Sequence, residues 1–163
     1  MASAERIVIA VGNALRGDDA AGLEIGRRLS PADGIRVIEQ DGEVAAIVEA
    51  LRAARAAVIV DAAAGPRPGR LARFDAASHP LPARLLACST HAPGVAEAIE
   101  LARALGVLPR TCVVYAIEGA SFDVGAPMSA AVEGALAAAV ARIQAEIEAL
   151  GDAAPEQPAS IGS

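Results

Sequence analysis

Aromatic residues are scarce in this chain of 163 residues, where they make up 2% and tryptophan is absent. Hydrophobic residues nevertheless make up 54%, so the core must be built from alanine, valine, leucine and isoleucine. Such small side chains permit close contacts between helices and a sheet, which favours layered α/β packing. The length suits one domain with a single well-covered sheet.

Basic runs and long apolar segments are also missing. The net charge of −6 would repel a phosphate backbone, so we expect no nucleic-acid partner. No segment approaches the roughly 18 uncharged apolar residues that span a bilayer, and the N-terminal segment lacks the basic region of a signal peptide. We therefore expect a cytoplasmic, monomeric protein with no membrane partner.

The two cysteines, Cys88 and Cys112, are too few and too isolated for a disulfide framework or a CxxC metal site. Buried free thiols are the ordinary interpretation of such residues. We assign them no chemistry.

Apolar segments of strand length alternate along the chain with amphipathic segments of helix length. The expected strands are 6–11, 35–39, 57–60 and 111–117, and the expected helices are 20–29, 44–54, 92–105 and 129–150. This alternation is typical of parallel βαβ units with right-handed crossovers and a sheet covered on both faces. The short, charged segment from Arg70 to Asp75 is typical of an edge strand, which can run antiparallel.

The C-terminal segment differs in composition from the rest. Residues 151–163 are rich in proline, alanine, serine and glycine, so we expect a disordered tail. Residues 1–150 are then the single folded domain.

Polar side chains interrupt the structural segments at three places: Asp18 and Asp19 after the first strand, Asp61 after the third, and His91 before a helix. The carboxyl ends of parallel strands share one edge of a sheet, where open α/β sheets bind ligands, so Asp19 and Asp61 can converge. The loop with His91 is expected to return to this edge, and a helix N-terminus favours the neutral imidazole that binds metal. Two carboxylates and one imidazole suit Zn²⁺, Ni²⁺ or another divalent transition ion and leave one coordination position open.

Each of these residues also has a structural interpretation. Asp18 can cap the first helix, and Asp19 in a first helical turn can favour the helix dipole. Asp61 can cap a turn over residues 62–65. His91 can cap a helix or pack, so the local sequence leaves both interpretations open.

The segment Gly12–Gly22, GNALRGDDAAG, resembles the GNxLxxDDxxG signature of hydrogenase maturation proteases. Val60-Asp61-Ala62 resembles the second motif of that family, and Ser89-Thr90-His91 resembles the third. Residues 117–122 and 125–129 resemble its closing strand and loop. The resemblance extends in order over nearly the whole chain.

This resemblance implies a three-layer α/β/α sandwich with a mixed, mostly parallel five-stranded sheet, of the phosphorylase/hydrolase-like kind. It places the family's metal-binding acid on Asp19, its second acid on Asp61 and its histidine on His91. It implies an endopeptidase that removes the C-terminal extension of a nickel–iron hydrogenase large-subunit precursor after nickel insertion. The precursor is then the expected partner and carries the nickel, while zinc or another divalent ion can occupy the site in isolation.

In the mechanism that follows, Asp19, Asp61 and His91 bind the precursor's nickel, which polarises the scissile carbonyl or a water. A carboxylate, Asp18 or Asp61, accepts a proton. No Ser–His–Asp or Cys–His arrangement is evident, which disfavours a covalent acyl-enzyme. Two alternatives stay open: a metal-sensing or metal-delivery protein without peptidase activity, and a hydrolase of the same fold acting on another substrate.

The chain departs from the family's pattern at two places. Asp41-Gly42-Glu43 stands where two glycines are frequent after the second strand, and Ala92 follows His91 where glutamine or glycine is common. Both positions bear on how a substrate tail is held, and the sequence does not determine which hydrogenase is processed.

Overall fold

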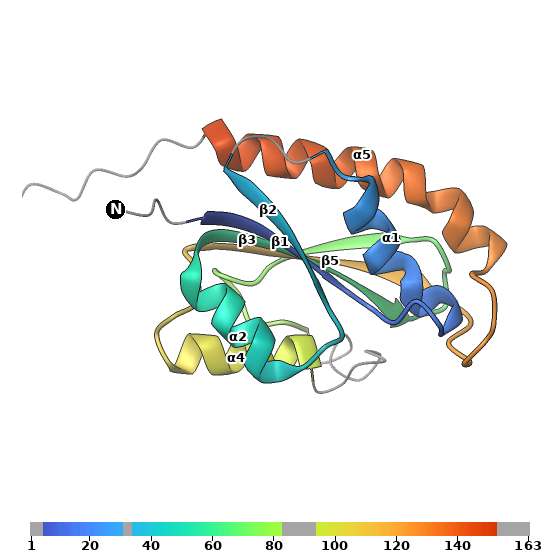
Figure 1. Ribbon diagram of the computed structural model, residues 1–163, viewed down its shortest axis with the longest axis horizontal. Helices are drawn as coiled ribbons and strands as arrows, with labels where there is room; N and C mark the ends of the chain where they lie inside the picture. Colours follow the sequence, from blue (N-terminus) through green and yellow to red (C-terminus); the bar gives the residue numbers. More distant parts are fainter. Residues whose placement is uncertain (1–4, 31–33, 83–93, 153–163) are drawn as a thin grey trace, which may run out of the picture.

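A five-stranded sheet lies at the centre of the molecule (Figure 1). The computed structural model describes residues 5–30, 34–82 and 94–152. Its strands are β1 (Glu5–Val11), β2 (Ile35–Gln40), β3 (Ala54–Ala64), β4 (Leu71–Asp75) and β5 (Thr111–Gly119). They follow the order β2-β1-β3-β5-β4, in which only β4 runs antiparallel to its neighbour. The mixed, mostly parallel sheet and its antiparallel edge strand are confirmed.

Helices cover both faces of this sheet. They are the 3₁₀ turn η1 (Gly17–Ala20) and the helices α1 (Ala21–Arg28), α2 (Val44–Ala53), α4 (Gly94–Ala104) and α5 (Ala130–Asp152). Helices α1 and α5 pack together on one face, and α2 and α4 pack together on the other (Figure 1). The predicted three-layer α/β/α sandwich is therefore confirmed.

Alternation along β1 supplies both halves of the core. Ile7, Ile9 and Val11 belong to the apolar cluster under α2 and α4, whereas Val8 belongs to the cluster under α1 and α5. Successive side chains of a strand point to opposite faces, so a strand covered on both sides must be apolar throughout. The continuous hydrophobic runs of this sequence follow from that requirement.

Strand β3 is longer than expected. The prediction that it stops at Val60 before a turn at 62–65 is wrong, because Ala56–Ala64 pairs with Thr111–Gly119 in one unbroken parallel ladder. The hydrogen bonds of this ladder outweigh the low strand propensity of the three alanines after Asp61. Asp61 therefore lies within a strand and does not cap a turn.

The start of the first helical segment also differs from the prediction. The turn η1 precedes α1, and no side chain caps either element, so the role of Asp18 as a helix cap is wrong. At the other end of the chain, α5 continues to Asp152, into the segment expected to be disordered. The rest of that tail, residues 153–163, lies outside the described residues.

The remaining expectations concern the thiols and the membrane. Cys112 is buried in β5, and burial raises the pKa of its thiol to about 12, whereas Cys88 lies outside the described residues. Among the residues that the structure describes, no helix is long and apolar enough to cross a bilayer. The cytoplasmic location and the monomeric state stay predictions.

Gly22 lets α1 approach the sheet closely, because a Cβ there would overlap the carbonyl oxygens of Val11 and Val60. We predict that Gly22→Ala destabilises the protein by about 1–3 kcal/mol, as overpacking does. Gly134→Ala in α5 is the matched control, since a Cβ there meets nothing within 4 Å and alanine favours the helix. Urea unfolding measures both, and a Gly22→Ala variant as stable as wild type would contradict the close approach.

Candidate functional site at the carboxyl edge of the sheet

The four parallel strands end at one edge of the sheet, where β3 and β5 extend beyond the pairing of β3 with β1. The pairing of β1 with β3 ends at Ala10 and Val60, and β3 continues beside β5. Asp61, which pairs with Ala116, is the first residue of β3 beyond its pairing with β1. The extension of β3 beyond this pairing thus places the Asp61 carboxylate at the position where open α/β sheets bind ligands.

Asp61 lies on the face of β3 that carries Ile59, under α2 and α4. Its residue is 6% exposed, and the backbone N–H of Ala62 donates a hydrogen bond to its Oδ1 atom at 2.8 Å. Among the described residues it borders a cavity of about 20 Å³, enough for roughly one water molecule. The other lining residues are Ala62, Ala63, Leu81, Val95, Ala96, Val114 and Ala116.

Asp19 lies in η1, the turn that contacts β3, and it is fully buried. The Nη1 atom of Arg16 is 4.0 Å from its Oδ2 atom. Its backbone is fixed as well, because its carbonyl accepts a hydrogen bond from the N–H of Asn13 and its N–H donates to Arg16. A Cβ on Gly12 would overlap the Asp19 carbonyl, which explains the glycine at the start of this loop.

The structure thus places Asp19 and Asp61 on adjoining elements, as the topology predicts. His91 lies outside the described residues. The helix that follows it, α4, begins at Gly94, and Val95 and Ala96 in its first turn line the cavity beside Asp61. Among the described residues no group of three or more metal-ligating side chains occurs, so the proposed three-ligand site stays a prediction.

Asp18 is buried beside Asp19 but serves a different set of partners. Its Oδ2 atom accepts hydrogen bonds from the N–H of Ala120 at 2.7 Å and of Ser121 at 3.0 Å, and from the hydroxyl of Ser129 at 2.9 Å. Its Oδ1 atom accepts the N–H of Ser129 at 2.7 Å. Both carboxylate oxygens are therefore bound within the β5–α5 loop (residues 120–129).

These bonds also determine the ionisation of Asp18. Burial alone would raise the pKa of its carboxyl, but the hydrogen bonds from Ala120, Ser129 and Ser121 outweigh it, and the pKa lies below the ordinary value of 3.8. A carboxylate with a lowered pKa and both oxygens engaged is a weak proton acceptor. The geometry therefore favours a structural role for Asp18.

Further contacts join the same two loops. The N–H of Asp18 donates to the carbonyl of Ser121 at 2.7 Å, and the N–H of Gly125 donates to the carbonyl of Leu15 at 2.7 Å. The Nε atom of Arg16 donates to the carbonyl of Phe122 at 3.2 Å. The loop after β1 is thus held along its length by the β5–α5 loop.

Sequence reasoning assigned no role to Arg16 or Ser129. Both residues belong to segments that resemble family motifs, and this resemblance was the sequence feature that could have indicated their roles. Their partners lie more than 100 positions away along the chain, and local patterns carry no information about such pairs.

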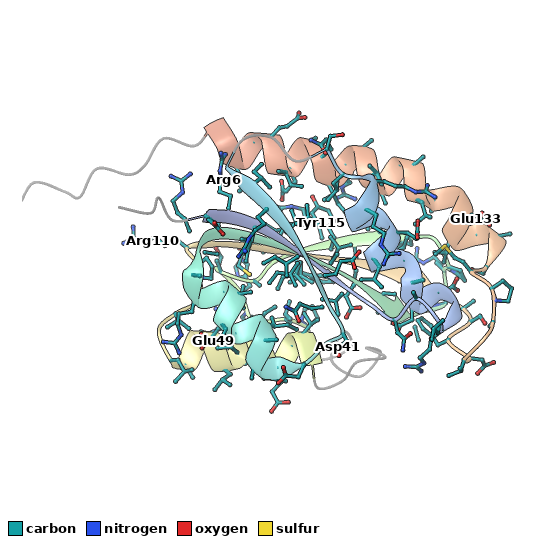
Figure 2. The ribbon with its side chains drawn as sticks, viewed as in Figure 1. Arg6, Asp41, Glu49, Arg110, Tyr115 and Glu133 are labelled. Atoms are coloured by element: carbon teal, nitrogen blue, oxygen red, sulfur yellow. The ribbon has the colours of Figure 1, made fainter. Side chains whose placement is uncertain are left out.

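An open cleft lies beside the site, at the ends of β1 and β2. This cleft has a volume of about 490 Å³. It is lined by Gly12, Leu23, Glu39, Gln40, Asp41 and Glu43. Figure 2 shows Asp41 just beyond the end of β2, and the Nε atom of Arg27 pairs with Glu39 at 2.6 Å. The cleft is acidic and borders the loop that leads to Asp19.

Comparison with known proteins identifies the family of the chain. The family model described as "HycI: Hydrogenase maturation protease" matches residues 23–146. The chain belongs to the hydrogenase maturation protease family. The match includes Asp61 and begins after Asp19, and the family is one of proteases, as the sequence resemblance implies.

Solved structures with the same fold include three from this family. The hydrogenase maturating endopeptidase HybD from E. coli is 20% identical with a TM-score of 0.77, and the alignment covers 90% of this chain and 94% of that one. HybD from Thermococcus kodakarensis is 24% identical with a TM-score of 0.70, covering 88% and 99%. The hydrogenase 2 maturation peptidase from Thaumarchaeota archaeon SCGC_AB-539-E09 is 28% identical with a TM-score of 0.59, covering 90% and 98%. No curated protein sequence matches the chain.

The hydroxyl of Ser129 gives a direct test of the Asp18 contacts. We predict that Ser129→Ala destabilises the protein by about 1–2 kcal/mol, because a hydrogen bond to a buried carboxylate is lost. Ser121→Ala is the control, since Ser121 contacts Asp18 through its backbone N–H. Equal stability of the two variants in urea unfolding would contradict the role of the hydroxyl.

Proposed function

We propose that this protein is an endopeptidase that removes the C-terminal extension of a nickel–iron hydrogenase large-subunit precursor once nickel is in place. The observation that carries this proposal is the pair of buried carboxylates, Asp19 and Asp61, at the carboxyl edge of a chain from the hydrogenase maturation protease family. HybD from E. coli and from Thermococcus kodakarensis are named as a hydrogenase maturating endopeptidase and a [NiFe] hydrogenase maturation protease.

The nickel in this proposal belongs to the substrate. Asp19, Asp61 and His91 bind it, and two carboxylates with one imidazole are a suitable donor set for a divalent transition ion. Burying two carboxylates on adjoining elements is unfavourable because like charges repel in a low-dielectric site, and a divalent cation offsets that repulsion. The buried positions of Asp19 and Asp61 support this assignment.

The nickel supplies Lewis-acid polarisation of the scissile carbonyl when the precursor is bound. Of the two carboxylates considered as proton acceptors, Asp61 fits better than Asp18, because a cavity for about one water lies beside it. Asp61 takes the proton of that water as it attacks the carbonyl, and the proton then passes to the departing amine. The apolar side chains of Leu81, Val95 and Val114 line the same cavity.

The C-terminal extension of the precursor binds in the cleft at the ends of β1 and β2. The cleft is open, and it borders Gly12 at the start of the loop to Asp19. Its carboxylates on Asp41 and Glu43 favour an extension that carries positive charge, whereas Glu39 is already paired with Arg27. The acidic segment that departs from the family's pattern therefore bears on substrate choice.

Metal titration tests the ligand set without the precursor. We expect Ni²⁺ and Zn²⁺ to bind in calorimetry with one-to-one stoichiometry, and Asp19→Asn, Asp61→Asn and His91→Ala each to weaken binding at least ~10-fold through loss of a ligand. Asp75→Asn is the control, because Asp75 pairs near the start of β5, at the opposite edge of the sheet. Binding that none of the three substitutions changes would contradict the ligand assignment.

Cleavage of a purified precursor tests the reaction itself. We expect processing of the nickel-loaded precursor, no processing of the nickel-free precursor, and loss of activity in Asp19→Asn and Asp61→Asn but not in Asp75→Asn. Mass spectrometry of the released extension measures the outcome. Equal cleavage of the precursor with and without nickel would exclude nickel recognition. Metal binding without cleavage would favour a metal-delivery protein. Cleavage of unrelated peptides but not of the precursor would favour a different hydrolase.

A further inference from the structure

We propose that Asp18 is a positioning residue that fixes Asp19 in the orientation needed to bind the precursor's nickel. This inference rests on the proposed function, in which Asp19 is a ligand. It changes the role of Asp18 from a proton acceptor to an anchor. The anchor acts by attaching the turn η1 to the β5–α5 loop.

The turn that carries Asp19 has little stability of its own. It is a 3₁₀ turn of four residues, Gly17–Ala20, and no side chain caps it. Short 3₁₀ segments have poor hydrogen-bond geometry, so contacts from outside must fix the direction of the Asp19 side chain. Asp18 supplies four such contacts through its carboxylate.

The side chains of the adjacent residues Asp18 and Asp19 point in different directions. A 3₁₀ turn has three residues per turn, so consecutive side chains point about 120° apart. Asp18 points into the β5–α5 loop, so the side chain of Asp19 points in another direction, within a turn that contacts β3. One peptide unit connects the two residues, so any shift of Asp18 displaces Asp19 as well.

Arg16 provides a second connection between the same loop and Asp19. Its Nε atom donates to the carbonyl of Phe122, and its Nη1 atom lies 4.0 Å from Oδ2 of Asp19. Movement of the β5–α5 loop therefore reaches Asp19 both through the backbone from Asp18 and through the guanidinium of Arg16. A misplacement of about 1 Å at a reacting centre can lower the rate ~100-fold.

Hydrogen exchange tests this coupling without metal or precursor. In Asp18→Asn the amide group replaces one accepting oxygen with a donor, so we expect faster exchange at the N–H groups of Ala120, Ser121 and Ser129. We also expect faster exchange at Asn13 and Asp19, whose N–H groups donate to the carbonyls of Asp19 and Arg16 in the loop after β1. The strands β1, β3 and β5 should keep wild-type protection.

The matched control is Ile147→Ala, which leaves a cavity under α5. Ile147 is 17 residues beyond the start of α5, about 25 Å along its axis, so this variant loses stability without touching the two loops. Exchange in Asp18→Asn that matches wild type at Asn13 and Asp19 would overturn the inference. So would faster exchange at these two residues in Ile147→Ala.

Kinetics with the nickel-loaded precursor give the second measurement. We expect kcat to fall ~10–100-fold in Asp18→Asn with KM changed less than about 3-fold, an intermediate fall in Ser129→Ala, and wild-type kinetics in Ile147→Ala below its melting temperature. Wild-type kcat in folded Asp18→Asn would overturn the positioning role alone. A wild-type protein that cleaves no precursor would contradict the proposed function, and hydrogen exchange would still decide whether Asp18 holds the Asp19 turn.

Discussion

The ladder of hydrogen bonds between β3 and β5 continues beyond the pairing of β3 with β1, and the corner that holds the candidate site depends on this extension. It carries Asp61 beyond the last residue paired with β1. It also extends β5 to Gly119, so that the next two N–H groups, of Ala120 and Ser121, reach the Asp18 carboxylate. The pairing of β3 with β5 therefore positions Asp61 directly, and it positions Asp19 indirectly through Asp18.

Close contacts between backbones complete this corner, and they require residues without a Cβ. Gly12 lies against the carbonyl of Asp19, and Gly22 lies against the carbonyls of Val11 and Val60. Gly119 lies against the side chain of Asp18. A chain so poor in aromatic residues fills its core with small side chains, and the elements approach one another closely as a result. These close approaches of the main chain help to position the two acids, together with the hydrogen bonds of the Asp18 carboxylate.

Hydrophobic periodicity was sufficient to predict the parallel strands and the covering helices, because each reflects burial of nearby residues. The short, charged segment at 70–75 indicated the edge strand, and the family resemblance implied the mixed five-stranded sheet. The placement of Asp19 and Asp61 on adjoining elements also followed from parallel topology. The end of β3 and the role of Asp18 did not, since both depend on hydrogen bonds to residues of β5 and its loop far along the chain. A local pattern that favours a cap at Asp18 cannot reveal that donors around residue 120 occupy its carboxylate. The role of His91 as a metal ligand stays a prediction.

The bonds between Asp18 and Ser129 join an early loop to the residue that precedes the last helix. Closing a loop of this length has an entropic cost that only the finished sheet and helix offset. During synthesis on a ribosome the first two-thirds of the chain can form βαβ units, but the turn with Asp19 stays unsupported until Ser129 has left the exit tunnel. A chain that stops before Ser129 would therefore contain both acids but lack the bonds that hold the turn with Asp19.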